Sequence, residues 1–193
     1  YEEAYLIYRD FTRLHPTHKR SDYVVLRMAQ SVFKRASKRA GRDQSSTEQA
    51  VSILREFERK FPSSSHSETA SALMQDARDR LAKRELIIAR FYEKRSAWGA
   101  AQRRADNLLQ AYPSSEHVPA ALAIRGRALH SWGETEQANL TAQKLKDLAP
   151  NSTAIRRLER YLQEPPGERP EEAATFRPYR APGINTGAAP MTR

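Results

Sequence analysis

The 193-residue sequence predicts an all-α fold made of stacked helical hairpins. Apolar residues recur three and four positions apart over long segments, which is the spacing of one helix face. A small residue followed twelve positions later by a proline recurs along the chain. The chain has only seven glycines and no segment that alternates apolar and polar residues, which argues against a β fold. Hydrophobic residues at 39% and charged residues at 29% fit a helical protein with a well-hydrated surface.

The segment 79–113 contains the clearest hairpin. Its first helix continues through Arg95 and carries an apolar face made of Leu81, Ile88, Phe91 and Tyr92. The stretch 96–99 interrupts the helical pattern, and a second helix is expected from Ala100 to Ala111, just before Pro113. Because an isolated helical hairpin cannot bury its apolar face, the rest of the chain should contain further copies.

The repeat becomes visible when the small residue and the proline are used as anchors. The four pairs are Ala4 and Pro16, Ala50 and Pro62, Ala101 and Pro113, and Ala138 and Pro150. Further apolar residues follow each alanine by four and by seven positions, so each copy is an amphipathic helix that ends before its proline. Ser, Thr or Asn residues follow each proline, and they are expected to cap the next helix: Thr17, Ser63, Ser64, Ser114, Ser115, Asn151 and Ser152.

This pattern matches the second helix of a tetratricopeptide repeat. The last copy also carries the first-helix residues of such a repeat, at Gly126, Leu129 and Gly133. Successive prolines lie 46, 51 and 37 residues apart, whereas the standard period is about 34. The extra residues are expected in a polar loop at 38–46 and in a lengthened helix at 67–95.

We therefore predict two regions. Residues 1–163 form a tetratricopeptide-repeat domain that opens on the second helix of a repeat and ends with a capping helix at about 153–163. That capping helix carries Ile155, Leu158 and Leu162 at helical spacing. Residues 164–193 contain six prolines and few large aliphatic residues, and this tail is predicted to be disordered.

The net charge of +10 lies within the helical region, because residues 164–193 carry four acidic residues and four arginines. Such a charge can reflect a nucleic acid, an anionic membrane surface or an acidic protein partner. The basic residues are interleaved with carboxylates, which favours solvated helix faces with ion pairs three and four residues apart. No nucleic-acid-binding motif accompanies them. A nucleic-acid partner is therefore not expected.

Signals of catalysis or of a cofactor are not found in the sequence. The chain has no cysteine, no glycine-rich phosphate loop and no nucleophile elbow. His15 and His18 flank a Pro-Thr turn that supplies no further metal ligands. We expect a non-enzymatic protein with no catalytic residues, no metal and no cofactor.

Three features together resemble the BamD family, the tetratricopeptide lipoproteins of the outer-membrane β-barrel assembly machinery. They are the run Leu14-His15-Pro16-Thr17-His18 with Asp22-Tyr23, the loop Arg42-Asp43-Gln44, and the segment 79–98. The resemblance covers about residues 1–152 and begins inside the second of the family's five repeats, so that the first repeat and a half is missing. Ser96 stands where the family usually has glycine.

The resemblance implies a non-catalytic scaffold on the periplasmic face of the outer membrane of a Gram-negative bacterium, anchored by an N-terminal lipid that this chain does not include. The implied partners are the membrane-proximal POTRA domain of BamA, other lipoproteins of the complex, and unfolded outer-membrane proteins. The contact with BamA would involve Arg103, Arg104 and Asn107. A second group, His15, His18, Asp22 and Tyr23, would either contact substrate or form a turn that packs the helices.

Two alternative functions remain open from the sequence. Another periplasmic repeat adaptor, such as a coordinator associated with the Tol–Pal system, would share the repeats but not the long helix before Trp98. A basic helical repeat that binds nucleic acid would show an affinity that falls steeply with salt concentration.

Overall fold

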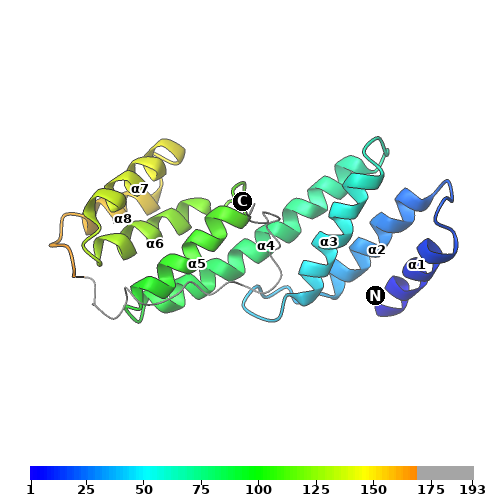
Figure 1. Cartoon of the computed structure of the whole chain (residues 1–193), viewed down its shortest axis with the longest axis horizontal. Helices are drawn as coiled ribbons and strands as arrows, with labels where there is room; N and C mark the ends of the chain where they lie inside the picture. Colours follow the sequence, from blue (N-terminus) through cyan, green and yellow to red (C-terminus); the bar gives the residue numbers. More distant parts are fainter. Residues whose placement is uncertain (169–193) are drawn as a thin grey trace, which may run out of the picture.

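The computed structural model describes residues 1–168. This part of the chain is helical and contains α1 (Glu2–Leu14), α2 (Ser21–Arg35), α3 (Ser45–Lys60), α4 (Ser67–Glu93), α5 (Trp98–Ala111), α6 (Val118–His130), α7 (Thr135–Leu148) and α8 (Thr153–Tyr161). Each helix packs against the next one, and they follow one another along the long axis of the molecule (Figure 1). The predicted all-α solenoid of helical hairpins is confirmed.

Three successive cores run along the solenoid. The first lies between α2, α3 and the first half of α4, and it includes Val32, Leu54 and Phe57. The second lies between the rest of α4, α5 and α6, and the third between α6, α7 and α8. With 27 residues, α4 is long enough to contribute Met74 to the first core and Leu86 to the second. This helix therefore connects two hydrophobic cores that would otherwise be separate.

The apolar face predicted for α4 is partly wrong. Leu81 is buried, but the side chain of Phe91 is 48% exposed. The guanidinium of Arg95 lies 3.6 Å from the centroid of the Phe91 ring and covers part of it. Phe91 is near the end of α4, where the residues turned toward α5 and α6 are Leu86 and Ala89 instead.

The predicted capping by residues after each proline holds only at α8, where the Ser152 hydroxyl accepts a hydrogen bond from the Ile155 amide at 3.3 Å. Helices α2, α4 and α6 begin five residues after their prolines, so the serines come too early to reach the free amides of the helix. The hydroxyls of Ser64 and Ser115 instead accept from the amides of His66 and His117, within the turns.

The ion pairs also differ from the prediction. Lys60 and Glu56 pair within one turn of α3 as expected. A second group of ion pairs joins one helix to a neighbouring helix: Arg35–Glu2, Arg84–Glu48, Arg104–Glu85, Arg125–Asp106, Arg127–Glu93 and Lys146–Glu159. In a stack of antiparallel helices, a long side chain reaches the next helix as easily as the next turn of its own.

The C-terminal end of the described chain folds back on the solenoid. In α8, Ile155 and Leu158 are buried in the third core. After α8, the carbonyl of Glu164 contacts Nε2 of the buried His130 at 2.9 Å, and the amide of Gly167 donates to the His130 carbonyl at 3.2 Å. Most of the predicted tail, residues 169–193, lies outside the described residues.

Candidate docking face on helix α5

Helix α5 carries the three residues that the sequence singled out for partner binding. Its buried side consists of Ala101, Ala105 and Leu108, which pack in the second core. Arg103, Arg104 and Asn107 lie within one turn of α5 beside this buried side, and Arg104 is the one that borders it. Asn107 is exposed, and both arginines are partly buried. The three residues are neighbours on α5, and their shared role in partner binding stays a prediction.

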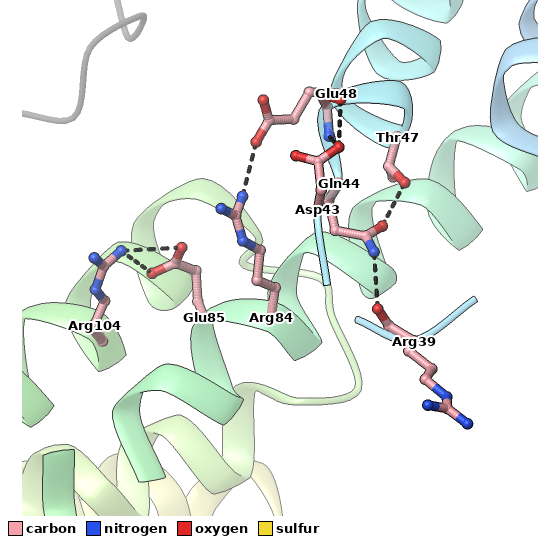
Figure 2. A network of polar contacts seen from close by, with 9 residues as sticks. Arg39, Asp43, Gln44, Thr47, Glu48, Arg84, Glu85 and Arg104 are labelled. Carbon is pink, nitrogen blue, oxygen red and sulfur yellow. Dashed lines mark hydrogen bonds and ion pairs between the residues drawn. The ribbon is translucent and has the colours of Figure 1, made fainter. Parts of the chain in front are cut away.

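Arg104 is held by an ion pair with the neighbouring helix (Figure 2). Its Nη1 lies 3.1 Å from Oε2 and 3.4 Å from Oε1 of Glu85 on α4. The side chains of Arg104 and Glu85 are 31% and 16% exposed. This pair fixes the direction of the guanidinium, and a guanidinium has further N–H groups that can donate to a second carboxylate.

The polar network continues across α4 to α3. Nη1 of Arg84 lies 3.1 Å from Oε1 of Glu48, so alternating charges run over three adjacent helices (Figure 2). Tyr112, at the end of α5, has its pKa raised by burial and by the nearby carboxylates of Glu85 and Glu48. Sequence reasoning missed Glu85, Arg84 and Glu48 because the paired residues lie 19 and 36 positions apart. No sequence pattern indicates contacts over such separations.

The loop between α2 and α3 is anchored beside this network by Gln44, whose side chain is fully buried. Its Nε2 donates to the Arg39 carbonyl at 3.1 Å, and its Oε1 accepts from the Thr47 hydroxyl at 2.6 Å (Figure 2). The same Nε2 also donates to the Ser37 carbonyl at 3.1 Å. The side chain thus satisfies backbone groups that the loop leaves unpaired. The sequence predicted a polar loop here but not this anchor.

On its other side, α5 is tied to α6 by Asp106. Nε of Arg125 donates to Oδ1 of Asp106 at 2.8 Å, and Arg125 also contacts the hydroxyl of Thr141 on α7. Burial raises the pKa of Asp106 more strongly than the arginine lowers it. One arginine thereby links three successive helices at the edge of the candidate face.

The second predicted group lies in the turn between α1 and α2. The rings of His15 and His18 both pack against Phe11, with centroids 5.1 and 5.2 Å apart. Oδ2 of Asp22 accepts a hydrogen bond of 2.6 Å from Ser64 in the turn between α3 and α4. This hydrogen bond is the main reason that the pKa of Asp22 is lowered.

Tyr23 completes the junction between the two turns. Its ring lies 5.6 Å from that of His66, and the guanidinium of Arg20 lies 4.8 Å from its centroid. The two turns also border an open cavity of about 320 Å³. These contacts show that Asp22 and Tyr23 join adjacent repeats; contact with substrate stays a prediction.

Two other kinds of feature are absent from residues 1–168. In this part of the chain, no cluster of three or more His, Asp or Glu side chains is arranged to hold a metal ion. Within the same residues, no helix combines the length and apolar character needed to cross a bilayer.

Comparison with known proteins settles the family. The family model YfiO, described as an outer membrane lipoprotein, matches residues 1–145. Three curated relatives are each named outer membrane protein assembly factor BamD. The chain is 29% identical to that of Neisseria meningitidis (serogroup A) over 172 residues, 31% to that of Vibrio cholerae over 147, and 37% to that of Haemophilus influenzae over 115. The chain belongs to the BamD family.

The matches cover most of this chain but a smaller part of each BamD relative. They include 78%, 70% and 60% of this chain, in the order Neisseria, Vibrio and Haemophilus. In the same order they include 64%, 60% and 44% of the relative. The chain therefore spans less than two thirds of the length of these relatives, and the family model extends over α1 to α6 and most of α7.

Proposed function

We propose that this chain is a non-catalytic scaffold subunit of the outer-membrane β-barrel assembly complex, held at the periplasmic face of the outer membrane by an N-terminal lipid. Its C-terminal repeats bind the membrane-proximal POTRA domain of BamA, and its docking face consists of Arg103, Arg104 and Asn107. Other lipoproteins of the complex and unfolded outer-membrane proteins are its further partners. Membership of the BamD family supports the role, and the geometry of α5 supports the docking face.

The observation that carries the docking proposal is the orientation of Arg104. Its ion pair with Glu85 holds a partly exposed guanidinium at the surface between α4 and α5, in a geometry fixed before a partner arrives. A preoriented side chain loses less conformational entropy on binding than a mobile one. The planar guanidinium can donate to a carboxylate of the POTRA domain while it keeps its contact with Glu85.

The test is a binding measurement with purified BamA POTRA domain, supported by a pull-down from detergent-solubilised outer membrane. Arg104→Ala removes the proposed donor. We expect binding to weaken by about 30-fold or more, since loss of one partner of a desolvated charged pair costs about 2–5 kcal/mol.

Arg84→Ala provides a matched control, because Arg84 has a similar exposure and an ion pair of the same 3.1 Å length one helix away. This variant should bind BamA like the wild type. Equal losses in both variants would show that general positive charge, not docking at Arg104, drives the contact. If the wild type does not recover BamA, the proposed scaffold role fails.

A charge exchange separates folding from docking. Arg104→Glu alone places a carboxylate beside Glu85 and should lower the melting temperature. The double variant Arg104→Glu with Glu85→Arg restores the internal pair, so we expect the fold to recover while BamA binding stays weak. Recovery of binding in the double variant would contradict a specific role for Arg104.

A further inference from the structure

A strip of unpaired cations runs along the second half of α4. Lys83, Arg90 and Lys94 are exposed, and none of them has an ion-pair partner among residues 1–168. Ile87 lies between them, four positions after Lys83, three before Arg90 and seven before Lys94. These spacings place the four side chains on one side of the helix. The strip is about 16 Å long, since an α-helix rises about 1.5 Å per residue.

Two large apolar side chains stand among these cations. Ile87 is 40% exposed, and Phe91, four positions further along the same side, is 48% exposed. The exposed Arg95 adds a cation beside Phe91, with its guanidinium 3.6 Å from the ring centroid. The basic face of α4 consists of these exposed cations and apolar residues: Lys83, Ile87, Arg90, Phe91, Lys94 and Arg95.

The two carboxylates in this part of α4 are withdrawn from the basic face. Glu85 is paired with Arg104 on α5, and Glu93 is paired with Arg127 on α6. The side chains of Glu85 and Glu93 are only 16% and 19% exposed. The negative charges of this helix segment are therefore neutralised between the helices, whereas its unpaired positive charges face the solvent.

The loop between α2 and α3 extends this surface beside Ile87. A Cβ atom at Gly41 would lie 3.9 Å from the Ile87 side chain, so the loop and the helix are neighbours here. Arg39 and Arg42 of the loop are exposed, and within the described part of the chain they too have no ion-pair partner. The carboxylate of the loop, Asp43, accepts a hydrogen bond at the start of α3. The loop thus adds further positive charge to the basic face.

We infer that the basic face of α4 binds an anionic phospholipid surface. Long cationic side chains without fixed partners can spread over an array of phosphate groups, while Ile87 and Phe91 enter the boundary between headgroups and acyl chains. Exposed cations and apolar side chains on one side of a helix are typical of a membrane interface. A specific protein partner is matched better by a side chain held in place, as Glu85 holds Arg104.

The inference rests on the proposed function for the position of the chain, because a lipid anchor holds it beside a bilayer. The contact through α4 is additional to that anchor and determines which side of the solenoid faces the membrane. Glu85, which holds Arg104, lies two positions before Ile87 and therefore on the opposite side of α4. The α5 docking residues thus stay accessible to the POTRA domain while the basic face contacts lipid.

The first test measures binding of the purified chain, without a lipid anchor, to vesicles by flotation. Vesicles of equal parts phosphatidylglycerol and phosphatidylcholine are compared with vesicles of phosphatidylcholine alone. We expect binding to the anionic vesicles, at least about tenfold weaker binding to the neutral ones, and a loss of affinity between about 50 mM and 300 mM salt. Equal binding to both kinds of vesicle, or binding to neither, overturns the inference.

A pair of double variants tests the cations. Arg90→Gln with Lys94→Gln removes two charges from the basic face, and we expect at least about a tenfold loss of affinity for the anionic vesicles. Arg55→Gln with Arg59→Gln is the matched control, because these two residues are also exposed and four positions apart, on α3. The control should bind like the wild type, and both double variants should keep the wild-type melting temperature. Equal losses of affinity would reduce the effect to net charge and overturn the site.

A fluorescent label tests whether the apolar residues enter the bilayer boundary. The chain has no cysteine, so a single introduced cysteine can carry an environment-sensitive fluorophore. With Ile87→Cys we expect the emission of the label to shift to the blue on anionic vesicles. Leu140→Cys on α7 is the comparison, since Leu140 is an apolar residue with 52% exposure, and its label should not shift. A shift at position 140 without one at position 87 would mean that another face binds and would overturn the inference.

Two further measurements separate this inference from the proposed function and from an acidic protein partner. Arg90→Gln with Lys94→Gln should keep its affinity for the BamA POTRA domain, and a loss would assign these cations to that interface and overturn the membrane contact. If the wild type binds the POTRA domain but no vesicles, the membrane contact alone is refuted. Polyglutamate is tested in parallel. Binding of polyglutamate without binding of vesicles would identify an acidic polypeptide as the ligand and overturn the inference too.

Discussion

At the scale of single residues, Ser96 adopts a backbone conformation that usually favours glycine. Its φ of 55° places it in the left-handed region, and it is the one residue other than glycine with positive φ in the described part of the chain. The amide of Ala97 donates to the Tyr92 carbonyl, and the amide of Ser96 donates to the Glu93 carbonyl. These two hydrogen bonds end α4 with a residue in the left-handed conformation. Glycine is the residue usually found at that position of a helix ending.

Ser96→Gly should therefore stabilise the protein. The substitution removes the steric cost of a side chain in the left-handed region, which exceeds the entropic cost of glycine in the unfolded chain, and we expect a gain of about 0.5–1 kcal/mol. Chemical denaturation followed by circular dichroism measures the change.

Ser63→Gly is the matched control, since Ser63 lies exposed in the turn before α4 and does not have a positive φ. We expect this control to be neutral or slightly destabilising because glycine adds freedom to the unfolded chain. A similar gain in both variants would mean that the backbone at Ser96 is not strained.

At the scale of helices, the contact between α5 and the turn after α6 depends on Gly99. A Cβ atom at position 99 would lie 2.3 Å from Cη2 and 2.5 Å from Cζ2 of Trp132. The indole therefore packs directly on the backbone of the first turn of α5. In the same way, a Cβ at Gly126 would meet the Leu158 side chain at 2.8 Å, so α6 and α8 also approach closely at a glycine.

Gly99→Ala should destabilise the protein by about 1–3 kcal/mol, even though alanine favours helix formation more than glycine does. The Trp132 ring must move away, and its fluorescence should shift to the red in a Trp98→Phe background. Thermal denaturation and the emission spectrum measure both effects.

Gly41→Ala serves as the comparison, because a Cβ there would meet Ile87 at 3.9 Å, an ordinary contact. This variant should leave the stability and the emission spectrum nearly unchanged. An unshifted spectrum and an unchanged melting temperature in Gly99→Ala would show that the indole accommodates a methyl group at no cost.

At the scale of the whole molecule, each part of the solenoid is stabilised mainly by the hydrophobic core to which its own helices contribute. The third core contains Leu145, which is fully buried, and the first contains Phe57, which is 1% exposed. In Figure 1 the helices α2 and α3 of the first core and α7 and α8 of the third core lie toward opposite ends of the solenoid. In such proteins each repeat contacts mainly its neighbours, so a disturbance at one end weakens with distance.

Leu145→Ala should cost about 2–5 kcal/mol and accelerate amide hydrogen exchange in α6, α7 and α8 while α1, α2 and α3 stay protected. Phe57→Ala should give the reciprocal pattern. Hydrogen exchange followed by mass spectrometry measures both variants. Uniform acceleration along the chain in either variant would mean that the solenoid opens as one cooperative unit, with α4 transmitting the disturbance.

Features that depend on neighbours along the chain could be predicted from the order of the amino acids. Helical periodicity and helix-ending prolines follow from the geometry of one helix, so they predicted the all-α fold and the repeat. The BamD family likewise followed from runs of adjacent residues. The predicted boundary between domain and tail at residue 163 stays a prediction.

The contacts that each side chain makes across the stack depend on tertiary packing. The pairing of Arg104 with Glu85, the burial of Gln44 and the exposure of Phe91 all depend on how one helix lies against another. Small differences in helix rotation and turn length set these contacts. Such differences cannot be predicted from the pattern of residue types. For that reason the sequence predicted the elements and their order, whereas the partners of the charged residues emerged only from the packed helices.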